Sequence, residues 1–599
     1  MRKTNRKYDK IDALLVNLKG PTSYNSVTQY EVPLGLLSIA THCENKGFKV
    51  LVLNEPNVTL DLLLKIIAIE RIGVIGFHCN AENVWSVMSA IDILKKQNNS
   101  LLCIAGGPQV SASPWNARII EQSQCDIAVE GEGEEAFADI LAIVNNKFDN
   151  ISAFESVNGI TYRLKNKIVF NGRKSPSDLR CYPIPDRNLT YFPSAPTGAE
   201  SIYTSRGCPY KCAFCFEATK GSMYRTRDVS AVLNEVELLL KERTLRHLSI
   251  VDDLFMFSGV RVKEICEGFK RLQNRYHDFS WYCEGRANII RKNPELLDSM
   301  IDSGLVRLQI GIESGDQAIL DNYNKHLTLD DLRETARFCL KSGLISVVGN
   351  FIIGGPFETW ITISNSVAFA KELLEIAPGC IDIMSSTLAP YPGTAICLRP
   401  KKYGIDILDA DSITGPGNEY VFLKTKELSK SDILAARAGF DQEVEKKAAS
   451  LIPIISNDRA KKIFEARERF GIFTMWNRLF SLYRPNYFNY FGLQVTDGRI
   501  PFAKIPKKKL EDYKPLRTMP IIKFSNDLLV LNVNGTEMNF SALGTRIYEL
   551  CSGKLTIRQI TDILYAENAR SIDRAVLAEY VRLTFEKLDE GKLLIFSLI

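Results

Sequence analysis

The chain has 599 residues, of which 45% are hydrophobic and 24% charged, and a formal net charge of +5. This length is too great for one hydrophobic core and predicts several domains, and the composition excludes a disordered or fibrous protein. No apolar segment is long enough for a membrane span or a signal peptide, so we expect a cytoplasmic protein without membrane contact. The positive charge is diffuse, which argues against nucleic-acid binding.

Residues 1–150 predict an α/β domain with a doubly wound parallel sheet. Apolar runs at 12–18, 49–54, 74–79, 101–107 and 125–133 alternate with amphipathic segments. That alternation is typical of parallel strands with helices on both faces. Such a sheet binds ligands beyond the carboxyl ends of its strands. The loops expected there contain Gly20, His78, Gly106, Gly107, Glu130 and Gly131.

Residues 151–198 predict a linker that contains a hairpin and a proline-broken segment. From 199 to 400 the alternation resumes, with strands expected at 201–207, 247–253, 280–286, 305–314, 346–355 and 381–390. Six such units are too few for a closed eight-stranded barrel, so we expect a partial (β/α)6 barrel with an open side. An open side can admit a large substrate.

Residues 401–515 predict a helical extension followed by a basic linker, and the aromatic side chains at 470–492 are expected to pack in a core. Residues 516–599 predict a small winged-helix-like module. Short strands at 519–541 are joined by turns, and helices follow plausible capping residues at Ser541, Thr556 and Ser571.

The segment SRGCPYKCAFCFEATKG (205–221) places Cys208, Cys212 and Cys215 in one short loop after the first strand of the second domain. Three thiolates cannot complete the four-coordinate shell of a structural zinc ion, and no further cysteine or histidine lies nearby in sequence. They can hold three irons of a [4Fe–4S] cluster and leave the fourth iron open to another ligand. These cysteines are therefore the predicted metal ligands.

The spacing C-x3-C-x-Φ-C, with Phe214 as the aromatic residue, resembles the signature of the radical S-adenosylmethionine (radical SAM) superfamily. In that family the open iron binds SAM, and one electron from the cluster cleaves SAM to a 5′-deoxyadenosyl radical. The resemblance implies that SAM contacts residues at the strand ends. These are Phe214, Asp252, Asp253, Glu284, Arg286, Glu313, Asn350, Gly354, Gly355 and Glu358. No second cysteine cluster follows, so auxiliary clusters are not expected.

The first two domains together, over residues 11–400, resemble the cobalamin-binding class of radical SAM enzymes. The resemblance implies that the loops of the first sheet, from Gly20 to Gly131, bind cobalamin. Other cobalamin domains carry D-x-H-x-x-G after the first strand, whereas VNLKGPTSYNS (16–26) contains no histidine. His78 is then the only histidine expected in the domain's ligand-binding loops, and it is a candidate for the lower face of cobalt. The missing motif leaves open a vestigial domain that holds no cobalamin.

The C-terminal module resembles the peptide-chaperone fold known as a RiPP recognition element, where RiPP denotes a ribosomally synthesised and post-translationally modified peptide. The resemblance covers 519–597 and implies that the leader of a precursor peptide adds as a strand to the hairpin edge. Winged helices also bind DNA. Here the third helix, AEYVRLTFEKLDEG (578–591), carries mixed charges, which argues against a helix that reads a DNA groove.

Together these features predict a radical SAM maturase that methylates an unactivated carbon of a precursor peptide, with cobalamin as methyl carrier. The expected partners are the peptide leader and a reductant such as flavodoxin or ferredoxin. The alternative is a peptide epimerase or cross-linking maturase with a vestigial cobalamin domain, for which Cys397 and Cys283 are candidate thiols. A cluster-bearing regulator that binds DNA is the alternative outside enzymes. The peptide, the modified residue and the oligomeric state do not follow from the sequence.

Overall fold

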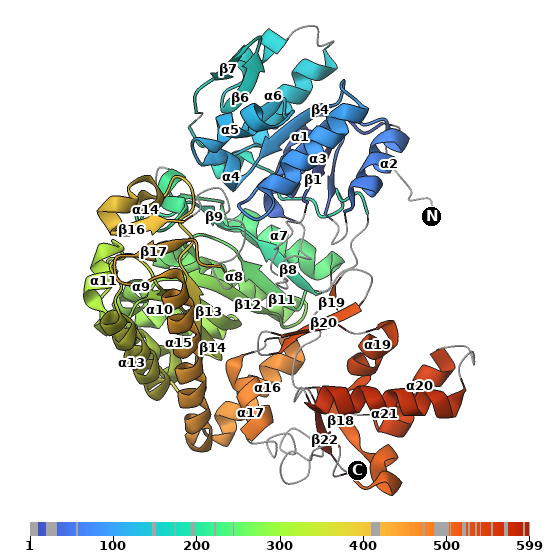
Figure 1. Ribbon diagram of the computed structural model, residues 1–599, viewed down its shortest axis with the longest axis vertical. Helices are drawn as coiled ribbons and strands as arrows, with labels where there is room; N and C mark the ends of the chain where they lie inside the picture. Colours follow the sequence, from blue (N-terminus) through green and yellow to red (C-terminus); the bar gives the residue numbers. More distant parts are fainter. Residues whose placement is uncertain are drawn as a thin grey trace.

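The computed structural model is shown in Figure 1. It describes residues 10–18, 33–54, 58–146, 151–173, 175–192, 198–220, 223–243, 245–408, 420–470, 472, 474–483, 502, 505–517, 523–524, 528–533, 536–539, 541–552, 555–567, 573–590 and 594–597.

The N-terminal domain is a seven-stranded sheet in the order β2-β1-β3-β4-β5-β6-β7. The strands are β1 (Ala13–Val16), β2 (Val50–Leu53), β3 (Val74–His78), β4 (Leu102–Gly106), β5 (Ile127–Val129), β6 (Ile160–Leu164) and β7 (Lys167–Phe170). The helices are α1 (Leu34–Asn45), α2 (Leu60–Glu70), α3 (Val84–Gln97), α4 (Pro108–Ser111), α5 (Trp115–Gln122) and α6 (Glu134–Asn145). The first five strands are parallel and have a hydrophobic core on each face, which confirms the predicted doubly wound sheet. Because β1 lies between β2 and β3, the strand order reverses there and opens a crevice for a ligand.

The hairpin predicted within the linker is instead part of this sheet. Strand β6 pairs antiparallel with β5, and β7 pairs with β6. Tyr162 of β6 is fully buried against the α6 side of the sheet with Phe154. The hairpin therefore covers the β5 edge, which would otherwise expose unpaired backbone groups.

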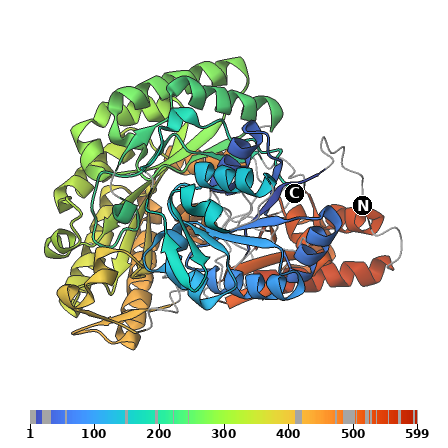
Figure 2. The ribbon, with the colours of Figure 1, turned by 90° about the horizontal axis from the view of Figure 1, so that it is seen from above.

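The second domain is a partial barrel of six parallel strands in the order β15-β14-β13-β12-β11-β8, as predicted. The strands are β8 (Ala199–Ile202), β11 (His247–Ile250), β12 (Ser280–Gly285), β13 (Leu305–Glu313), β14 (Ser346–Ile353) and β15 (Ile381–Thr387). The helices are α7 (Val229–Glu242), α8 (Gly259–Arg275), α9 (Ala287–Lys292), α10 (Pro294–Asp302), α11 (Gln317–Asn322), α12 (Leu329–Lys341) and α13 (Trp360–Ile376). A short ribbon of β9 (Ser205–Arg206) and β10 (Arg225–Thr226) flanks the cysteine loop, and α14 (Ala395–Leu398) and the hairpin β16 (Ile405–Ile407) and β17 (Leu423–Thr425) follow the last strand. Figure 2, seen from above, shows the N-terminal domain lying over one side of the barrel.

Three further helices pack against the barrel: the first runs along β14 and β15, and the other two lie at the end where these strands begin. They are α15 (Lys430–Leu451), α16 (Asn457–Phe470) and α17 (Met475–Tyr483). The Trp476 indole donates to the Ile381 carbonyl (3.0 Å), and Arg459 donates to the carbonyls of Gly379 (3.0 Å) and Ile345 (2.7 Å). Trp476 and Phe480 are fully buried, as predicted for this aromatic segment, whereas Tyr483 is exposed. Residues 484–492 lie outside the described residues.

In its described residues, the C-terminal unit has two small sheets and three helices. The sheets are β18 (Lys514–Arg517) with β22 (Leu594–Ser597), and β19 (Lys523–Phe524), β20 (Leu528–Val533) and β21 (Thr536–Asn539). The helices are α19 (Ala542–Leu550), α20 (Ile557–Glu567) and α21 (Arg574–Glu590). Phe502 and Tyr513 pack in the same core as these helices, and β18 pairs with β22, so this unit includes residues that precede 516. No helix in the described ranges is long and apolar enough to cross a membrane.

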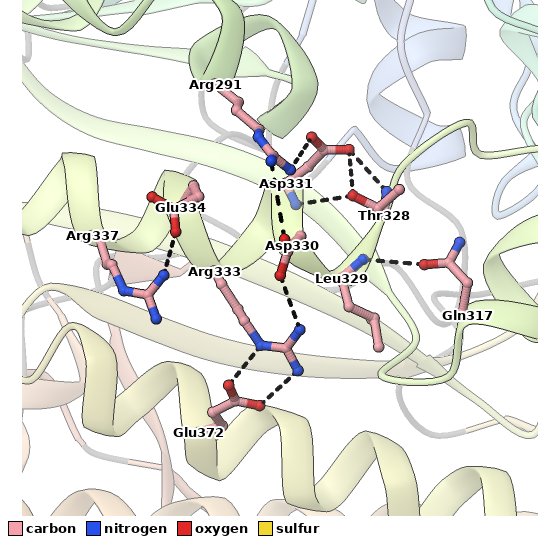
Figure 3. Close-up of polar contacts among 10 residues, drawn as sticks. All are labelled: Arg291, Gln317, Thr328, Leu329, Asp330, Asp331, Arg333, Glu334, Arg337 and Glu372. Atoms are coloured by element: carbon pink, nitrogen blue, oxygen red, sulfur yellow. Dashed lines mark hydrogen bonds and ion pairs between the residues drawn. The ribbon is translucent and has the colours of Figure 1, made fainter.

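Helix α12 shows how polar side chains join the outer helices of the barrel (Figure 3). Its capping residue Thr328 accepts a hydrogen bond from the Asp331 amide (3.1 Å), and the Asp331 carboxylate accepts one from the Thr328 amide (2.9 Å). Arg333, one turn on, binds Glu372 of α13 at 2.6 and 3.1 Å. The capping box fixes where α12 begins, and the ion pair fixes α12 against α13.

We expect Thr328→Ala to loosen the first turn of α12, because the Asp331 amide loses its acceptor. Loss of such a cap costs about 1 kcal/mol, or about fivefold in local opening. Hydrogen exchange measured on the α12 peptide should become faster by that factor. Arg337→Ala is the control, because Arg337 pairs only with Glu334 on the exposed face of the same helix; equal exchange in the two variants would contradict the role of the cap.

Candidate active site

The carboxyl ends of the first sheet face the cysteine loop of the barrel across a cavity of about 620 Å³. The N-terminal domain contributes His78, Gly106, Gly107, Glu130 and Gly131, five of the residues predicted to bind cobalamin. Gly20 lies outside the described residues. The barrel contributes Arg206, Gly207, Glu217, Thr219 and Asp253. Residues far apart in sequence, from both domains, therefore line a single cavity.

Another part of the cavity wall is apolar and is formed by Leu15, Leu36, Ile39 and Phe137. A Cβ atom on Gly76 would lie 2.7 Å from Leu15 Cδ2 and 3.0 Å from the Phe137 ring. Gly107 has φ +113°, and a Cβ there would lie 2.6 Å from the Cys79 carbonyl. These glycines let the wall of the cavity pack closely, and the volume and apolar lining of the cavity fit a large cofactor with an apolar portion.

His78 lies at the carboxyl end of β3, beside the point where the strand order reverses. Burial lowers the pKa of its imidazole to about 4, so the ring is neutral at physiological pH. A neutral imidazole can accept a hydrogen bond or bind a metal. Glu130 is already engaged, because its carboxylate accepts from Arg173 Nε (3.1 Å) and from the Asn116 amide.

The three predicted cluster ligands lie on the loop between β9 and β10. Backbone amides approach their sulfur atoms: that of Tyr210 at Cys208, and those of Glu217 and Ala218 at Cys215. The Arg286 guanidinium lies 3.8 Å from Cys212 Sγ, and its positive charge suits a thiolate. Burial raises the pKa of the Cys208 thiol, and it raises the pKa of the Cys215 thiol to about 11.

Within the described ranges, no three His, Cys, Asp or Glu side chains converge to hold a single metal ion. In a [4Fe–4S] cluster each thiolate binds a different iron, so the three sulfur atoms need not meet at one point. Three cysteines with amide donors and a neighbouring arginine therefore fit a [4Fe–4S] cluster.

The two aspartates at the end of β11 have different environments. Asp252 is buried, and its carboxylate accepts hydrogen bonds from the Thr204 amide (2.5 Å), the Thr204 hydroxyl (2.6 Å) and the Ser205 hydroxyl (2.6 Å). Asp253 lines the cavity and accepts from the Gly207 amide at 2.8 Å. Asp252 therefore holds the start of the cysteine loop, and the predicted contact to the SAM amino group remains a prediction for Asp253.

The strand ends of β12 and β13 carry the predicted acidic residues. Glu284 accepts from Gln309 Nε2 (3.1 Å), and burial raises its pKa. Glu313, in the left-handed region at φ +68°, forms a buried ion pair with Lys325. A Cβ on Gly311 would lie 2.0 Å from Glu313 Oε1, so a side chain there would displace this ion pair. Lys325 follows a separate helix and no local spacing connects it to Glu313, so the sequence alone does not indicate this pair.

The turn after β14 packs against Tyr323, whose ring in turn contacts the aromatic residue of the cysteine motif. Phe214 packs edge-on against Tyr323 at 5.4 Å, and Tyr323 lies over Gly355. Glu358 is fully buried and accepts from the Gly354 amide (2.6 Å) and the Gly355 amide (2.8 Å), and burial raises its pKa to about 8. Glu358 therefore stabilises the glycine turn from within. Asn350 lies on β14 beside Gly311 of β13.

The two candidate thiols differ in access. Cys283 is fully buried in the barrel core, where burial raises its pKa well above the usual value. It therefore cannot reach a substrate. Cys397 is half-buried on α14, and its neighbour Ile396 donates its amide to the Ala213 carbonyl of the cysteine loop (3.2 Å). Of the two, only Cys397 lies near the candidate site.

Sequence comparisons agree with both domains. The profile of the radical SAM superfamily matches residues 202–370, and that of the B12 binding domain matches residues 24–141. The chain therefore combines a B12-binding domain with a radical SAM domain, and its cofactors are a [4Fe–4S] cluster, SAM and cobalamin.

Individual proteins resemble the chain over the same region. An uncharacterized methyltransferase of Pyrococcus horikoshii, PH0819, is 27% identical over 373 residues, which is 61% of this chain and 77% of that protein. The structure of the cobalamin-dependent SAM radical enzyme OxsB with aqua-cobalamin and SAM is similar in fold, with a TM-score of 0.59 and 17% identity over 79% of this chain and 73% of OxsB. The radical SAM methyltransferase TsrM of Kitasatospora setae, solved with tryptophan and a SAM analogue, has a TM-score of 0.54 and 18% identity over 65% of this chain and 76% of TsrM.

We expect the triple variant Cys208→Ala/Cys212→Ala/Cys215→Ala to lose its iron–sulfide absorbance after anaerobic reconstitution. No other cysteines in the chain have this spacing. Iron and sulfide analysis and the visible spectrum measure the loss. Cys181→Ala, which removes an exposed cysteine outside the loop, should keep its full cluster content. Near-full cluster content in the triple variant would refute the ligand assignment.

Cobalamin bound to the protein should show a base-off spectrum, because the apolar part of the cavity can take up the nucleotide tail away from cobalt. Among single His→Ala variants, only His78→Ala should be able to change that spectrum, since His78 lines the cavity. His326→Ala, at an exposed residue of the barrel, serves as the control. A base-on spectrum of the unmodified protein would contradict this use of the cavity.

Proposed function

We propose that this protein is a radical SAM maturase that methylates an unactivated carbon of a ribosomally synthesised precursor peptide. The observation that carries the proposal is the single cavity lined by the cobalamin-binding loops and by residues that flank the cluster loop, Gly207 and Thr219 among them. When bound there, the cluster and SAM supply a radical that removes hydrogen from the substrate, and cobalamin supplies the methyl group. An external one-electron donor, such as flavodoxin or ferredoxin, reduces the cluster.

The chain's own residues prepare this chemistry. Cys208, Cys212 and Cys215 hold the cluster, and Arg286 places a positive charge beside one thiolate. Asp253 offers a cavity-facing carboxylate to the SAM amino group. The apolar walls exclude water from the radical, which would otherwise meet competing reactions. The reaction is expected in the cytoplasm, where the surroundings are reducing.

Methylation is supported by the names of similar proteins, because PH0819 and TsrM are both described as methyltransferases. The direct test is an anaerobic reaction of the reconstituted protein with methyl-deuterated SAM and a leader-bearing peptide. Mass spectrometry should find a deuterated methyl group on the peptide. A peptide without added methyl that instead gains one deuterium from D2O would favour epimerisation.

Epimerisation or cross-linking is the second candidate, favoured by the half-buried Cys397 beside the cluster loop. A thiol there could return a hydrogen atom to a peptide radical. Cys397→Ala distinguishes the two reactions, since it should abolish epimerisation but leave methyl transfer intact.

The peptide substrate is supported by the surface of the C-terminal unit. Helix α21 exposes Val576 (62%), Tyr580 (39%) and Leu583 (50%), whose spacing places them on one face. The Tyr580 hydroxyl lies 2.6 Å from the hydroxyl of Ser541, which follows β21 closely in the chain. Within the described residues, β21 pairs only with β20, so its other edge can accept a peptide strand. An open strand edge beside an apolar helix face suits an extended peptide.

Removal of the C-terminal unit should leave uncoupled SAM cleavage largely intact, because the predicted cluster and SAM contacts all lie before residue 400. Modification of a leader-bearing peptide should fall by about a hundredfold, since the effective concentration of the peptide is lost. The deletion should begin at residue 501 so that β18 is not left without β22. Chromatography of 5′-deoxyadenosine and mass spectrometry of the peptide measure the two activities.

The point variant Leu583→Lys tests the same surface without a deletion, because Leu583 is half exposed and contributes no core contact. It should weaken binding of labelled leader peptide to the full chain. Leu238→Lys, at an exposed leucine of α7 in the barrel, is the matched control. Undiminished leader binding by Leu583→Lys, or binding of duplex DNA in place of the leader, would overturn the peptide assignment.

A further inference from the structure

Two arginines face each other on the ribbon that closes the cysteine loop. Arg206 of β9 is the cross-strand partner of Arg225 of β10. Cys208 follows Arg206 by two positions, and Arg225 lies ten positions after Cys215. The two arginines therefore flank the cysteine loop on both sides and pair across its base.

Both arginines bind the loop that follows β5 in the cobalamin-binding domain. Arg206 contacts Glu134 Oε1 at 2.7 Å and Glu132 Oε1 at 3.3 Å, and Arg225 contacts Glu132 Oε2 at 3.1 Å. All four residues line the shared cavity. Glu132 receives both arginines, so the four side chains form one connected network between the domains.

The network is anchored by a carboxylate that water barely reaches. Glu134 is 2% exposed, lies at the first position of α6, and accepts from the Ser38 hydroxyl at 2.7 Å. Burial by itself would raise the pKa of Glu134, but the charge and hydrogen bond of Arg206 outweigh burial and lower it. A buried carboxylate of this kind depends on its partner, because removing the arginine would leave its charge uncompensated.

Aromatic rings fix the direction of Arg206. Its guanidinium lies 4.6 Å from the Tyr203 ring and 5.5 Å from the Tyr182 ring. Tyr203 belongs to the barrel, and Tyr182 belongs to the segment that connects the domains. A planar guanidinium held by two rings and two carboxylates has little freedom, which a lysine could not reproduce.

We propose that Arg206 and Arg225 are positioning residues that set the cobalamin-binding loop against the cluster loop. The inference rests on the proposed function in one respect: the radical and the methyl donor must act on the same substrate carbon. A misplacement of about 1 Å between reacting groups can cost about a hundredfold in rate. The network sits between the two loops whose separation determines that placement.

The test uses the full chain, reconstituted with its cluster and with aquacobalamin, and needs no peptide. In Arg206→Met and in the milder Glu134→Gln, iron content and the signal of the reduced cluster should stay unchanged. Cobalamin should bind about tenfold more weakly, since the loop loses its charge partner. The enhancement of cob(II)alamin spin relaxation by the reduced cluster should also decrease, because it reports the separation of the two centres.

The control is Arg333→Met, which removes an arginine that pairs with Glu372 entirely within the barrel (Figure 3). Arg206→Lys should recover only part of the affinity for cobalamin. The double variant Arg206→Met/Glu134→Gln should be no weaker than Arg206→Met alone, because both changes break the same contact.

Two outcomes would overturn the proposal: affinity and spin relaxation equal to those of the Arg333→Met control, or additive losses in the double variant. Failure to methylate any peptide would refute the proposed function and leave these two measurements unaffected.

Discussion

The carboxylate of Asp252 fixes the place where the chain leaves the first strand of the barrel and enters the cysteine loop. It is buried, and it accepts the backbone amide of Thr204 and the hydroxyls of Thr204 and Ser205. Arg261 of α8 binds the Thr204 hydroxyl (3.1 Å) and carbonyl (3.0 Å) from the other side. Burying a carboxylate costs much more free energy when its hydrogen-bond donors are missing, so this arrangement tolerates little movement. The arrangement of Asp252 with Thr204 and Ser205 therefore determines where Arg206 and the three cysteines lie.

Thr204 and Ser205 also lie between the two cofactor sites. On one side of Thr204 and Ser205 the chain continues into the cysteines, and Arg206 beside them reaches the N-terminal domain. The sheet of the N-terminal domain presents its own carboxyl-end loops to that arginine. The two sheets of parallel strands meet at their ligand-binding edges and thus share one cavity. Each sheet alone would offer only a shallow crevice. The arrangement suits chemistry in which two cofactors act on one atom.

Strand and helix periodicity was sufficient to predict both sheets, because parallel strands buried on both faces leave long apolar runs. The cysteine spacing was sufficient to propose the cluster loop. The sequence predicts the hairpin at 160–170 as part of a linker, because nothing local shows that β6 covers the edge of β5. Likewise Asp252 and Asp253 are adjacent and chemically equal in sequence, and only the fold turns one inward to Thr204 and the other to the cavity. Lys325 and Glu134 act through partners distant in sequence, which no spacing rule detects.

The pairing of β18 with β22 bears on the order in which the chain becomes functional during synthesis. Strand β18 precedes the three helices of the C-terminal unit, and β22 follows them. During synthesis on the ribosome, β18 cannot pair with β22 until the whole unit has emerged. The two preceding domains can fold before then, because domains generally fold from the N-terminus onward. The C-terminal unit is thus completed after the cavity between the first two domains has its walls.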